Sequence, residues 1–397
     1  MQRLELVGRH TRRPVNEDKG TRYRRAERTL RVLEVSAATA ALALLALSPV
    51  AGWLRNGGHR MVSPGLPAAY LLLADALIAA VILAVSLAVA AAAAAPFAVR
   101  RQGALARRYN LPAGSARVYV YGTSRRSVVL VAAGAAAWWV FAGISLRVPW
   151  LAGLGLAASI LGIAGIVMLL APWVILLSPR VRPLRDEAVT GRLHALAARA
   201  QLRLAGLHEW VFGPQGDHAN AALVGVVGPR RLLISDTLIA GCPPEEMDAV
   251  VAHELGHHSH GHTWQRVRSQ ATSLVLAVLG AQACAAGPAR WLGGTGGQLD
   301  PASIPWMILG AGAVWLASRP WHLALSRAHE AEADAFALEL TGRPDVLEKV
   351  LTRIGARNLS SEDDSLLTRA FFLTHPPIPA RIAAARRAAD AASTVPT

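Results

Sequence analysis

Four long apolar runs dominate the first 180 residues and are separated by polar segments. The runs cover residues 35–54, 68–99, 127–146 and 148–178. At about 1.5 Å per helical residue, each run is long enough to cross a hydrocarbon core of about 30 Å. We therefore predict an N-terminal transmembrane region of about four helices over residues 35–178, preceded by a basic cytoplasmic tail over residues 1–34.

The pattern changes at residue 179, where charged and apolar positions mix as they do in soluble domains. Apolar residues recur at helical spacing over residues 186–200. Three short runs separated by turn residues are typical of β-strands, at residues 207–212, 221–227 and 231–235. This segment therefore predicts a helix beside a small antiparallel sheet.

Two further apolar runs, residues 271–289 and 302–318, predict a second membrane hairpin. Residues 321–341 predict a cytoplasmic helix that follows or continues the second run beyond Pro320. The expected fold is a mostly α-helical membrane protein, with about six transmembrane helices and a cytoplasmic α+β domain with a small antiparallel sheet. The hairpin, residues 269–318, divides this domain into halves that cover residues 179–268 and 319–397.

Composition agrees with membrane insertion, because 53% of the 397 residues are hydrophobic and only 17% are charged. The formal net charge of +15 would also suit nucleic-acid binding. The arginines flank the apolar runs, however, as they do in the cytoplasmic loops of membrane proteins. We therefore expect the lipid bilayer, and no nucleic acid, as a partner. The oligomeric state is left open.

The distribution of arginine also predicts the orientation. Basic residues concentrate in residues 1–33, 100–126 and 180–268, whereas the intervening loops carry little positive charge. The positive-inside rule then places both termini and the α+β domain on the cytoplasmic side. We expect an integral, multi-pass protein of the cell or inner membrane.

The segment with the clearest chemistry is H-E-x-x-H, formed by His253, Glu254 and His257. Pro243 and Pro244 with the acids after them are start signals for a helix, which should end near Gly261. Residues four apart share one helix face, so both imidazoles can reach one metal ion. Glu254 is placed to take a proton from a metal-bound water.

Two imidazoles leave a zinc site incomplete. The longer metzincin spacing is absent, since Thr263 stands where that pattern needs a third histidine. Glu330 and Asp334 lie one helical turn apart on one face of the later helix, and Glu332 points roughly to the opposite side. A carboxylate ligand with a second carboxylate one turn away, which could hold an imidazole by its other N–H, fits a metal site.

The order of the motifs resembles the membrane zinc endopeptidases of the CAAX prenyl protease and HtpX family. The motifs are H-E-L-G-H, then E-x-x-A-D-x-F-A from residue 330, and then H-P-P-x-x-x-R from residue 375. Upstream, Asn220-Ala221, Gly225 and R-R-L-L-I-S-D-T-L from residue 230 are also similar to that family. The similarity covers about residues 180–385. The expected six spans are one fewer than the seven of the CAAX enzymes.

The resemblance implies a role for each matching residue. His253, His257 and Glu330 would bind one zinc ion per chain, with Glu254 as the general base. Asp334 would support the metal-binding histidines, and His375 and Arg381 would face the substrate or the oxyanion. Asn220 and Ala221 would form the strand edge that binds the substrate backbone. His258, His260 and His262 are expected to be solvated or to surround the site rather than to form a second metal site.

These observations predict a zinc-dependent endopeptidase that cleaves membrane-associated proteins or peptides at the cytoplasmic face. One alternative is a membrane sensor that signals through a zinc protease domain, which would need a sizeable external domain. Another is an inactive membrane scaffold, which would be expected to lack one of the ligands or the base.

Overall fold

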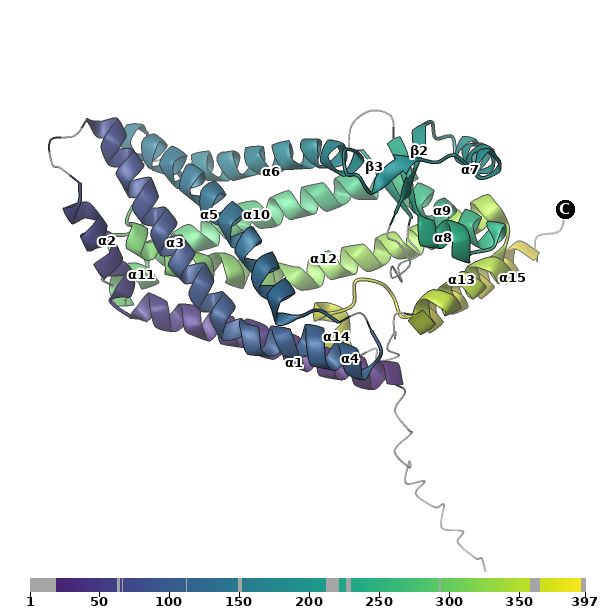
Figure 1. Ribbon diagram of the computed structural model, residues 1–397, viewed down its shortest axis with the longest axis horizontal. Helices are drawn as coiled ribbons and strands as arrows, with labels where there is room; N and C mark the ends of the chain where they lie inside the picture. Colours follow the sequence, from purple (N-terminus) through teal and green to yellow (C-terminus); the bar gives the residue numbers. More distant parts are fainter. Residues whose placement is uncertain are drawn as a thin grey trace, which may run out of the picture.

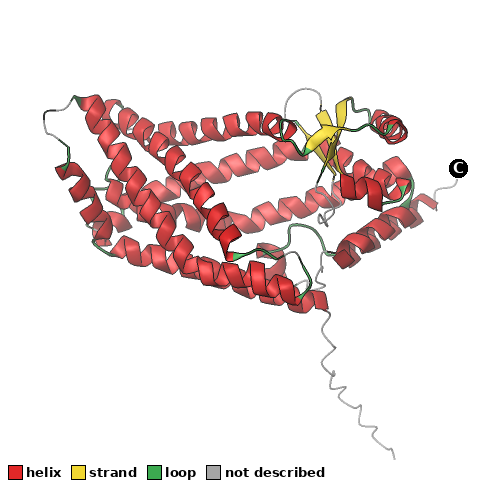
Figure 2. Ribbon diagram, in the orientation of Figure 1, coloured by secondary structure: helices red, strands yellow, loops and turns green. Residues whose placement is uncertain are grey.

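The computed structural model describes residues 19–62, 65, 67–111, 113–148, 152–211, 221–225, 230–292, 294–357 and 365–393. Long helices form most of the molecule, and a small sheet lies at one end of the bundle (Figures 1 and 2). Within the described residues, six helices are long and apolar enough to cross a membrane. The expected membrane protein with six spans is thus confirmed at the level of its helices.

The first helix starts earlier and stops sooner than the apolar run indicates. α1 (Lys19–Leu47) begins inside the basic segment that the sequence assigns to the tail. The run is then interrupted at Pro49, which precedes α2 (Val50–Arg60). Proline has no N–H and its ring clashes with the preceding turn, so it ends α1 here. Residues 1–18 lie outside the described residues.

The other membrane helices follow the predicted runs and extend beyond them. They are α3 (Ala68–Val99), α5 (Ala116–Arg147), α6 (Ala152–Leu176), α10 (His262–Ala286) and α12 (Ile304–Thr341). A π-helical turn (Arg100–Leu105) and α4 (Ala106–Arg108) extend α3, and α11 (Pro288–Leu292) with a 3-10 turn (Pro301–Ser303) joins α10 to α12. The helix predicted after the last span continues that span directly, because α12 is 38 residues long and passes through Pro320 without a break.

The sheet is mixed, which corrects the antiparallel sheet expected from the sequence. Its strands are β1 (Val181–Pro183), β2 (Leu204–Trp210), β3 (Ala221–Val224) and β4 (Arg230–Ser235), in the order β1-β2-β4-β3. β2 and β4 pair in parallel, while the two outer pairs are antiparallel. The side chains of Leu232, Leu233 and Ile234 are fully buried. A strand buried on both faces belongs inside a sheet, so β4 lies between β2 and β3.

The remaining elements surround this sheet and carry the site. They are α7 (Glu187–Arg199), α8 (Asp236–Gly241), α9 (Pro244–Ser259), α13 (Pro344–Arg357), α14 (Leu366–Phe371) and α15 (Ile378–Ser393). One apolar core joins Leu193 of α7, Leu232 of β4 and Leu255 of α9 with Leu340 near the end of α12. The two halves of the predicted domain therefore fold as one unit.

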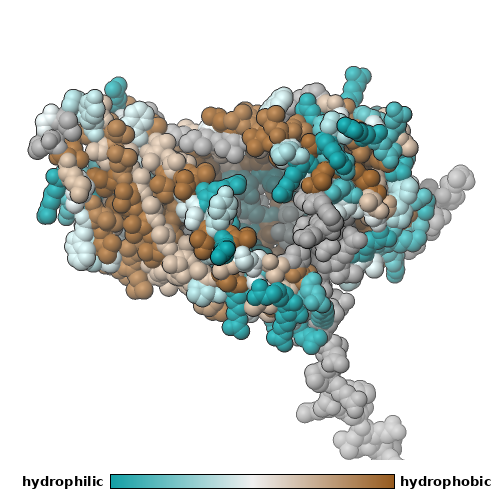
Figure 3. Space-filling view, in the orientation of Figure 1, coloured by the Kyte–Doolittle hydropathy of each residue, from teal (hydrophilic) through white to brown (hydrophobic). Residues whose placement is uncertain are grey.

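The surface follows the same division. Figure 3 shows hydrophobic residues over the membrane helices and hydrophilic residues over the end that carries the sheet. Large apolar side chains on the helices are exposed, for example Leu44, Leu77, Val128 and Val174. Contiguous apolar surface of this extent is suited to contact with lipid.

Helices α10 and α12 touch backbone to backbone, which fixes the hairpin between the two halves. A Cβ atom at Gly310 would lie 2.4 Å from the Gly280 carbonyl oxygen and 2.8 Å from Cys284 Sγ. A Cβ atom at Gly280 would lie 2.6 Å from Val314. Small residues permit such close helix crossings in membranes, where close packing replaces the hydrophobic effect as the driving force.

We predict that Gly310→Ala lowers the thermal stability of the purified protein, because α10 and α12 must separate to admit the methyl group. Overpacking of this kind costs about 1–3 kcal/mol. The matched control is Gly312→Ala on the same helix, where a Cβ atom has no neighbour within 4 Å. Thermal unfolding of both variants in detergent measures the difference, and equal melting temperatures would contradict the close crossing.

Candidate metal centre

The site forms where α9 crosses the distal part of α12, next to the sheet (Figure 1). α9 begins with Pro244 in its first turn, followed by Glu245 and Glu246, as the sequence predicts. Acidic side chains stabilise a helix N-terminus because they compensate its partial positive charge. The helix continues to Ser259 and so carries the whole H-E-L-G-H segment.

Gly256, the glycine of that segment, permits the close approach of the two helices. A Cβ atom there would lie 3.1 Å from Ala333 Cα and 3.2 Å from the Ala333 carbonyl oxygen. A larger residue would therefore push α12 away from α9. Since Glu330 lies one turn before Ala333, this crossing brings its carboxylate to the two histidines.

Three ligand atoms converge at the crossing, since the described residues His253, His257 and Glu330 offer atoms that all lie within 4.8 Å of one another. Nε2 of His253 is 3.5 Å from Glu330 Oε2, and Nε2 of His257 is 3.5 Å from Glu330 Oε1. Ligands about 2.1 Å from a tetrahedral zinc ion are separated by about 3.4 Å. The spacing and the donor set therefore fit zinc, with Glu330 rather than Asp334 as the third ligand.

Nδ1 of His253, the ring nitrogen on the side away from the other ligands, contacts a carboxylate. This carboxylate belongs to Asp334, the residue expected from the sequence to support a histidine ligand. Nδ1 of His253 lies 3.0 Å from Asp334 Oδ1. Burial lowers the pKa of the His253 imidazole, but the carboxylates of Asp334 and Glu330 outweigh it and raise this pKa to about 9. The negative field around the ring thus favours a cation at this position.

Arg381 completes this side of the site. Its Nε donates to Asp334 Oδ2 at 2.7 Å, and a terminal nitrogen donates to Asp334 Oδ1 at 2.6 Å. Burial lowers the pKa of Arg381, and the bonds with Asp334 more than offset it, so the pKa is raised. Its other terminal nitrogen is 3.6 Å from Glu330 Oε2. Arg381 therefore acts on the carboxylates, and its predicted contact with substrate remains a prediction.

The outer nitrogen of His257 is held by a histidine. Nδ1 of His257 lies 2.9 Å from Nδ1 of His262, and Nε2 of His262 lies 2.7 Å from Glu332 Oε2. Both hydrogen bonds can form with one tautomer of each ring: His257 Nδ1–H donates to Nδ1 of His262, and His262 Nε2–H donates to Glu332. The Nε2 lone pair of His257 is then free for a metal ion.

The sequence alone gave His262 no specific contact, and helical spacing predicted that Glu332 points away from the site. The turn at Gly261, with φ of 66°, folds His262 back against His257. This left-handed conformation suits glycine, which has no Cβ to clash. Gly261, near which the sequence predicts the end of the H-E-x-x-H helix, was the signal available in the sequence.

Glu254 is half-buried beside the two histidines. Burial raises the pKa of its carboxyl group, and the nearby charges of His253 and His257 oppose that rise. A carboxylate with a raised pKa is a better proton acceptor near neutral pH than one in water. Its position one residue after His253 therefore agrees with the predicted general base.

His375 reaches the centre from the segment before α15. Its Nδ1 lies 2.8 Å from Glu330 Oε2, while 59% of its side chain is exposed.

Ala221 begins the edge strand β3, which packs against α9. Asn220, the other predicted substrate-binding residue, lies outside the described residues.

The fold and the site together define the class: a multi-pass helical membrane protein with an H-E-x-x-H metalloprotease centre. Residues 183–389 match peptidase family M48. The chain belongs to this family, whose members are metalloproteases.

Several relatives carry descriptions that agree with this class. A CAAX prenyl protease 1 homolog of Arabidopsis thaliana is 30% identical over 211 residues, which cover 51% of this chain and 48% of that protein. An uncharacterized metalloprotease of Bacillus subtilis, YhfN, is 24% identical over 215 residues, with 53% and 50% covered. A protease HtpX homolog of Trichormus variabilis is 28% identical over 184 residues, with 45% and 61% covered. The chain thus spans about half the length of the first two relatives.

The fold extends over a longer part of the chain than these sequence matches. The crystal structure of S. mikatae Ste24p matches with a TM-score of 0.72 and covers 95% of this chain and 92% of that one, at 18% identity. This likeness supports the same arrangement of membrane helices and catalytic domain.

We predict that Gly256→Ala weakens zinc binding about tenfold, because part of a packing strain of about 1–3 kcal/mol is relieved when α12 moves away from α9. Zinc affinity of the purified protein, measured by competition with a chelating dye, tests this. Gly191→Ala on α7, where a Cβ atom has no neighbour within 4 Å, is the matched control and should bind zinc normally. Wild-type affinity in Gly256→Ala would show that the crossing tolerates a methyl group.

We also predict that Asp334→Asn weakens zinc binding by about 10- to 100-fold, the usual cost of losing a carboxylate that orients a histidine ligand. Glu339→Gln, an exposed carboxylate on the same helix, should leave the affinity unchanged. Zinc titration of both variants provides the comparison. If both lose the same affinity, the effect is one of overall charge and not of the bond to His253.

Proposed function

We propose that this protein is a zinc-dependent endopeptidase that cleaves membrane-associated proteins or peptides at the cytoplasmic face. The proposal rests on one observation: ligand atoms of His253, His257 and Glu330 converge on one point, and Glu254 lies beside them. Each outer nitrogen of the two imidazoles has its own partner, so the rings are oriented with Nε2 toward a common point.

Zinc suits this donor set because two neutral imidazoles and one carboxylate leave a fourth, open position. When bound there, zinc would supply Lewis acidity toward a water molecule and the scissile carbonyl group. The protein residues supply the remaining parts of the reaction, namely a base, an oxyanion contact and a surface that holds the peptide.

Glu254 is the proposed general base. Its carboxylate accepts the proton of the attacking water and returns it to the leaving amine. Burial raises its pKa, which strengthens its affinity for that proton. Proton transfer by a positioned side chain typically contributes about 10²- to 10⁴-fold to a rate.

His375 is the proposed oxyanion donor. It lies within hydrogen-bond distance of Glu330 yet remains largely exposed, so it can reach a substrate bound at the same point. A contact of this type contributes about 2.7–4 kcal/mol in other enzymes. Arg381 would help indirectly, because its bonds with Asp334 hold the carboxylate that orients His253.

The edge strand β3 is the proposed substrate-binding strand. In the described residues it pairs with β4 on one side only, and it packs against α9, the helix that carries His253. An extended peptide that pairs with its free edge would gain backbone hydrogen bonds and lie alongside the metal centre.

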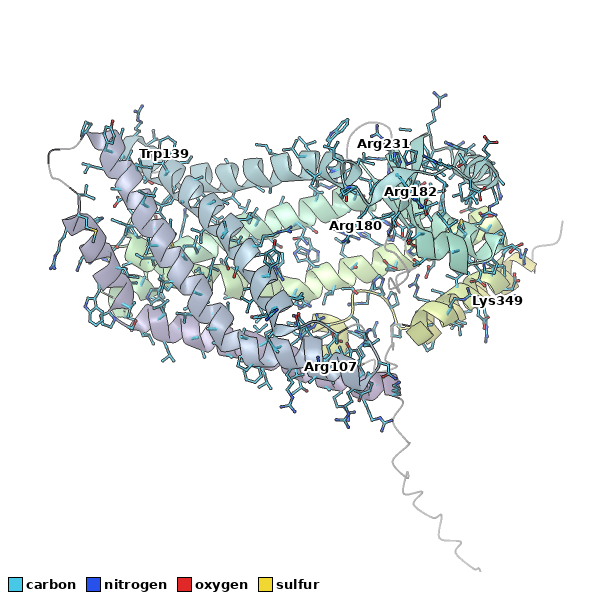
Figure 4. All side chains as sticks on the ribbon, in the orientation of Figure 1. Arg107, Trp139, Arg180, Arg182, Arg231 and Lys349 are labelled. Atoms are coloured by element: carbon cyan, nitrogen blue, oxygen red, sulfur yellow. The ribbon has the colours of Figure 1, made fainter. Side chains whose placement is uncertain are left out.

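Membrane-associated substrates at the cytoplasmic face are proposed from the position of the site and the charge distribution. Glu330 follows the apolar run of α12, which ends near Ser318. Arg180, Arg182 and Arg231 lie around the sheet, and Trp139 lies toward the opposite end of the bundle (Figure 4). Positive charge on the catalytic side is typical of the cytoplasmic face. Relatives described as CAAX prenyl proteases support a substrate of this kind.

The complete ligand set disfavours an inactive scaffold, since His253, His257, Glu254 and Glu330 are all present. A sensor would need an external domain, and the loops on the side opposite the sheet are short. We therefore retain the endopeptidase as the proposal.

We predict that Glu254→Gln retains one zinc ion per chain but lowers cleavage of a detergent-soluble test protein at least 100-fold, because the amide cannot accept the proton. The measurements are metal content by mass spectrometry and cleavage followed on a gel. Glu245→Gln, an exposed acid in the first turn of the same helix, is the matched control and should cleave normally.

A chelator should abolish cleavage by wild type and by Glu245→Gln, and added zinc should restore it. Normal cleavage by zinc-loaded Glu254→Gln would exclude Glu254 as the base. Cleavage that persists in the chelator would exclude the metal mechanism.

A further inference from the structure

A cavity of about 260 Å³, lined by residues of α10 and α12, lies apart from the metal ligands. Its polar lining includes Arg266, Ser269, Arg319, His322, Ser326 and His329. We call it the hairpin pocket. The peptidase mechanism proposed above uses none of these side chains.

The hairpin pocket presents positive charge and hydrogen-bond donors. None of the described residues that line it is acidic. Arg319 uses Nε to bind the Phe371 carbonyl oxygen at 2.7 Å, which leaves its terminal nitrogens for another partner. Arg266 is exposed on α10 and forms no ion pair within the part of the chain that the structure describes. Two guanidinium groups at one cavity are suited to a phosphate.

Inside the hairpin pocket, His329 provides an independent sign of a ligand. It is only 2% exposed, and its Nε2–H donates to Gln265 Oε1 at 2.8 Å, so its Nδ1 is an acceptor, and this Nδ1 has no hydrogen-bond partner among the described residues. A hydroxyl group of a lipid headgroup, such as that of phosphatidylglycerol, would satisfy this buried acceptor, whereas a phosphate oxygen, itself an acceptor, would not. His322 is held in place nearby by the hydroxyl groups of Ser269 at 3.3 Å and Ser273 at 2.8 Å.

The hairpin pocket lies at the depth of lipid headgroups. If α12 enters the hydrocarbon at Ile304, Arg319 and His322 lie about 23–27 Å further along the helix axis, near the far edge of a core of about 30 Å. Trp315 and Trp321, both exposed, flank this level, as tryptophans do at membrane interfaces. The hairpin pocket therefore lies at the level of the lipid phosphates of the adjacent leaflet.

We propose that the hairpin pocket binds the phosphate of an anionic phospholipid from the leaflet on the catalytic side. Basic pockets between membrane helices recognise such headgroups through combined charge and hydrogen bonding. One residue of the pocket lining also contacts a residue that supports the metal centre. The ring of His329 stacks on His262 at 4.1 Å, and His262 holds the ligand His257.

The test is lipid binding to the full chain in neutral detergent, followed by native mass spectrometry. Phosphatidylglycerol and phosphatidylcholine are titrated separately. Wild type should bind one phosphatidylglycerol in preference to phosphatidylcholine. Arg266→Gln should weaken that binding about fivefold, the effect expected for one interfacial cation. Ser326→Leu, which fills the pocket without changing its charge, should weaken it as well.

Arg268→Gln is the matched control, because Arg268 is an exposed arginine on the same helix that does not line the pocket. It should change binding less than twofold. An equal loss in Arg268→Gln and Arg266→Gln would overturn the proposal in favour of general surface attraction.

Two competitors separate the sources of the anion. Inorganic phosphate at millimolar concentration should leave the bound lipid in place, and displacement would assign the pocket to a free anion. A short peptide with a free C-terminal carboxylate should also fail to displace it. Displacement by the peptide would assign the pocket to substrate. None of these measurements depends on peptidase activity.

Discussion

The metal centre depends on the close crossing of α9 and α12 at Gly256. Ligands on different helices share a metal ion only if the helix backbones approach within the reach of short side chains. At Gly256 the missing Cβ allows contact with the Ala333 backbone, and this contact sets the distance from Glu330 to both histidines. The glycine of H-E-L-G-H is therefore a packing requirement of the site as well as a part of the motif.

The crossing fixes the ligand positions, and a second set of contacts fixes their orientation. His253 is held by Asp334, which Arg381 binds through two nitrogens. His257 is held by His262 and, through it, by Glu332. Three of these supporting residues, His262, Glu332 and Asp334, come from the membrane hairpin helices. The hairpin therefore supplies much of the framework of the centre as well as its third ligand.

Local features of this chain were predictable from the sequence, and long-range ones were not. The H-E-L-G-H helix follows from its proline and acidic start signals, and the spans follow from run length. The order of the strands depends on which strand is buried on both faces, a property that a short run such as residues 231–235 does not reveal. Likewise, helical spacing places Glu332 away from Glu330, but it cannot show that Gly261 turns His262 toward it. The resemblance named the candidate ligands, which the structure brings together, whereas their supporting contacts became visible only in the three-dimensional structure.

The continuity of α12 also determines where chemistry can occur relative to the bilayer. If the helix enters the hydrocarbon at Ile304, Glu330 lies at most about 39 Å along its axis, roughly 9 Å beyond a core of about 30 Å. A tilted helix would bring it closer. Because α12 is one unbroken helix and α10 is packed closely against it at Gly280 and Gly310, the distance of Glu330 from Ile304 along the helix is fixed. A peptide bond only a few residues from a membrane anchor can reach such a centre, since an extended chain covers about 3.3 Å per residue. A short distance between the bilayer and the ligands is therefore what the proposed membrane-held substrates require.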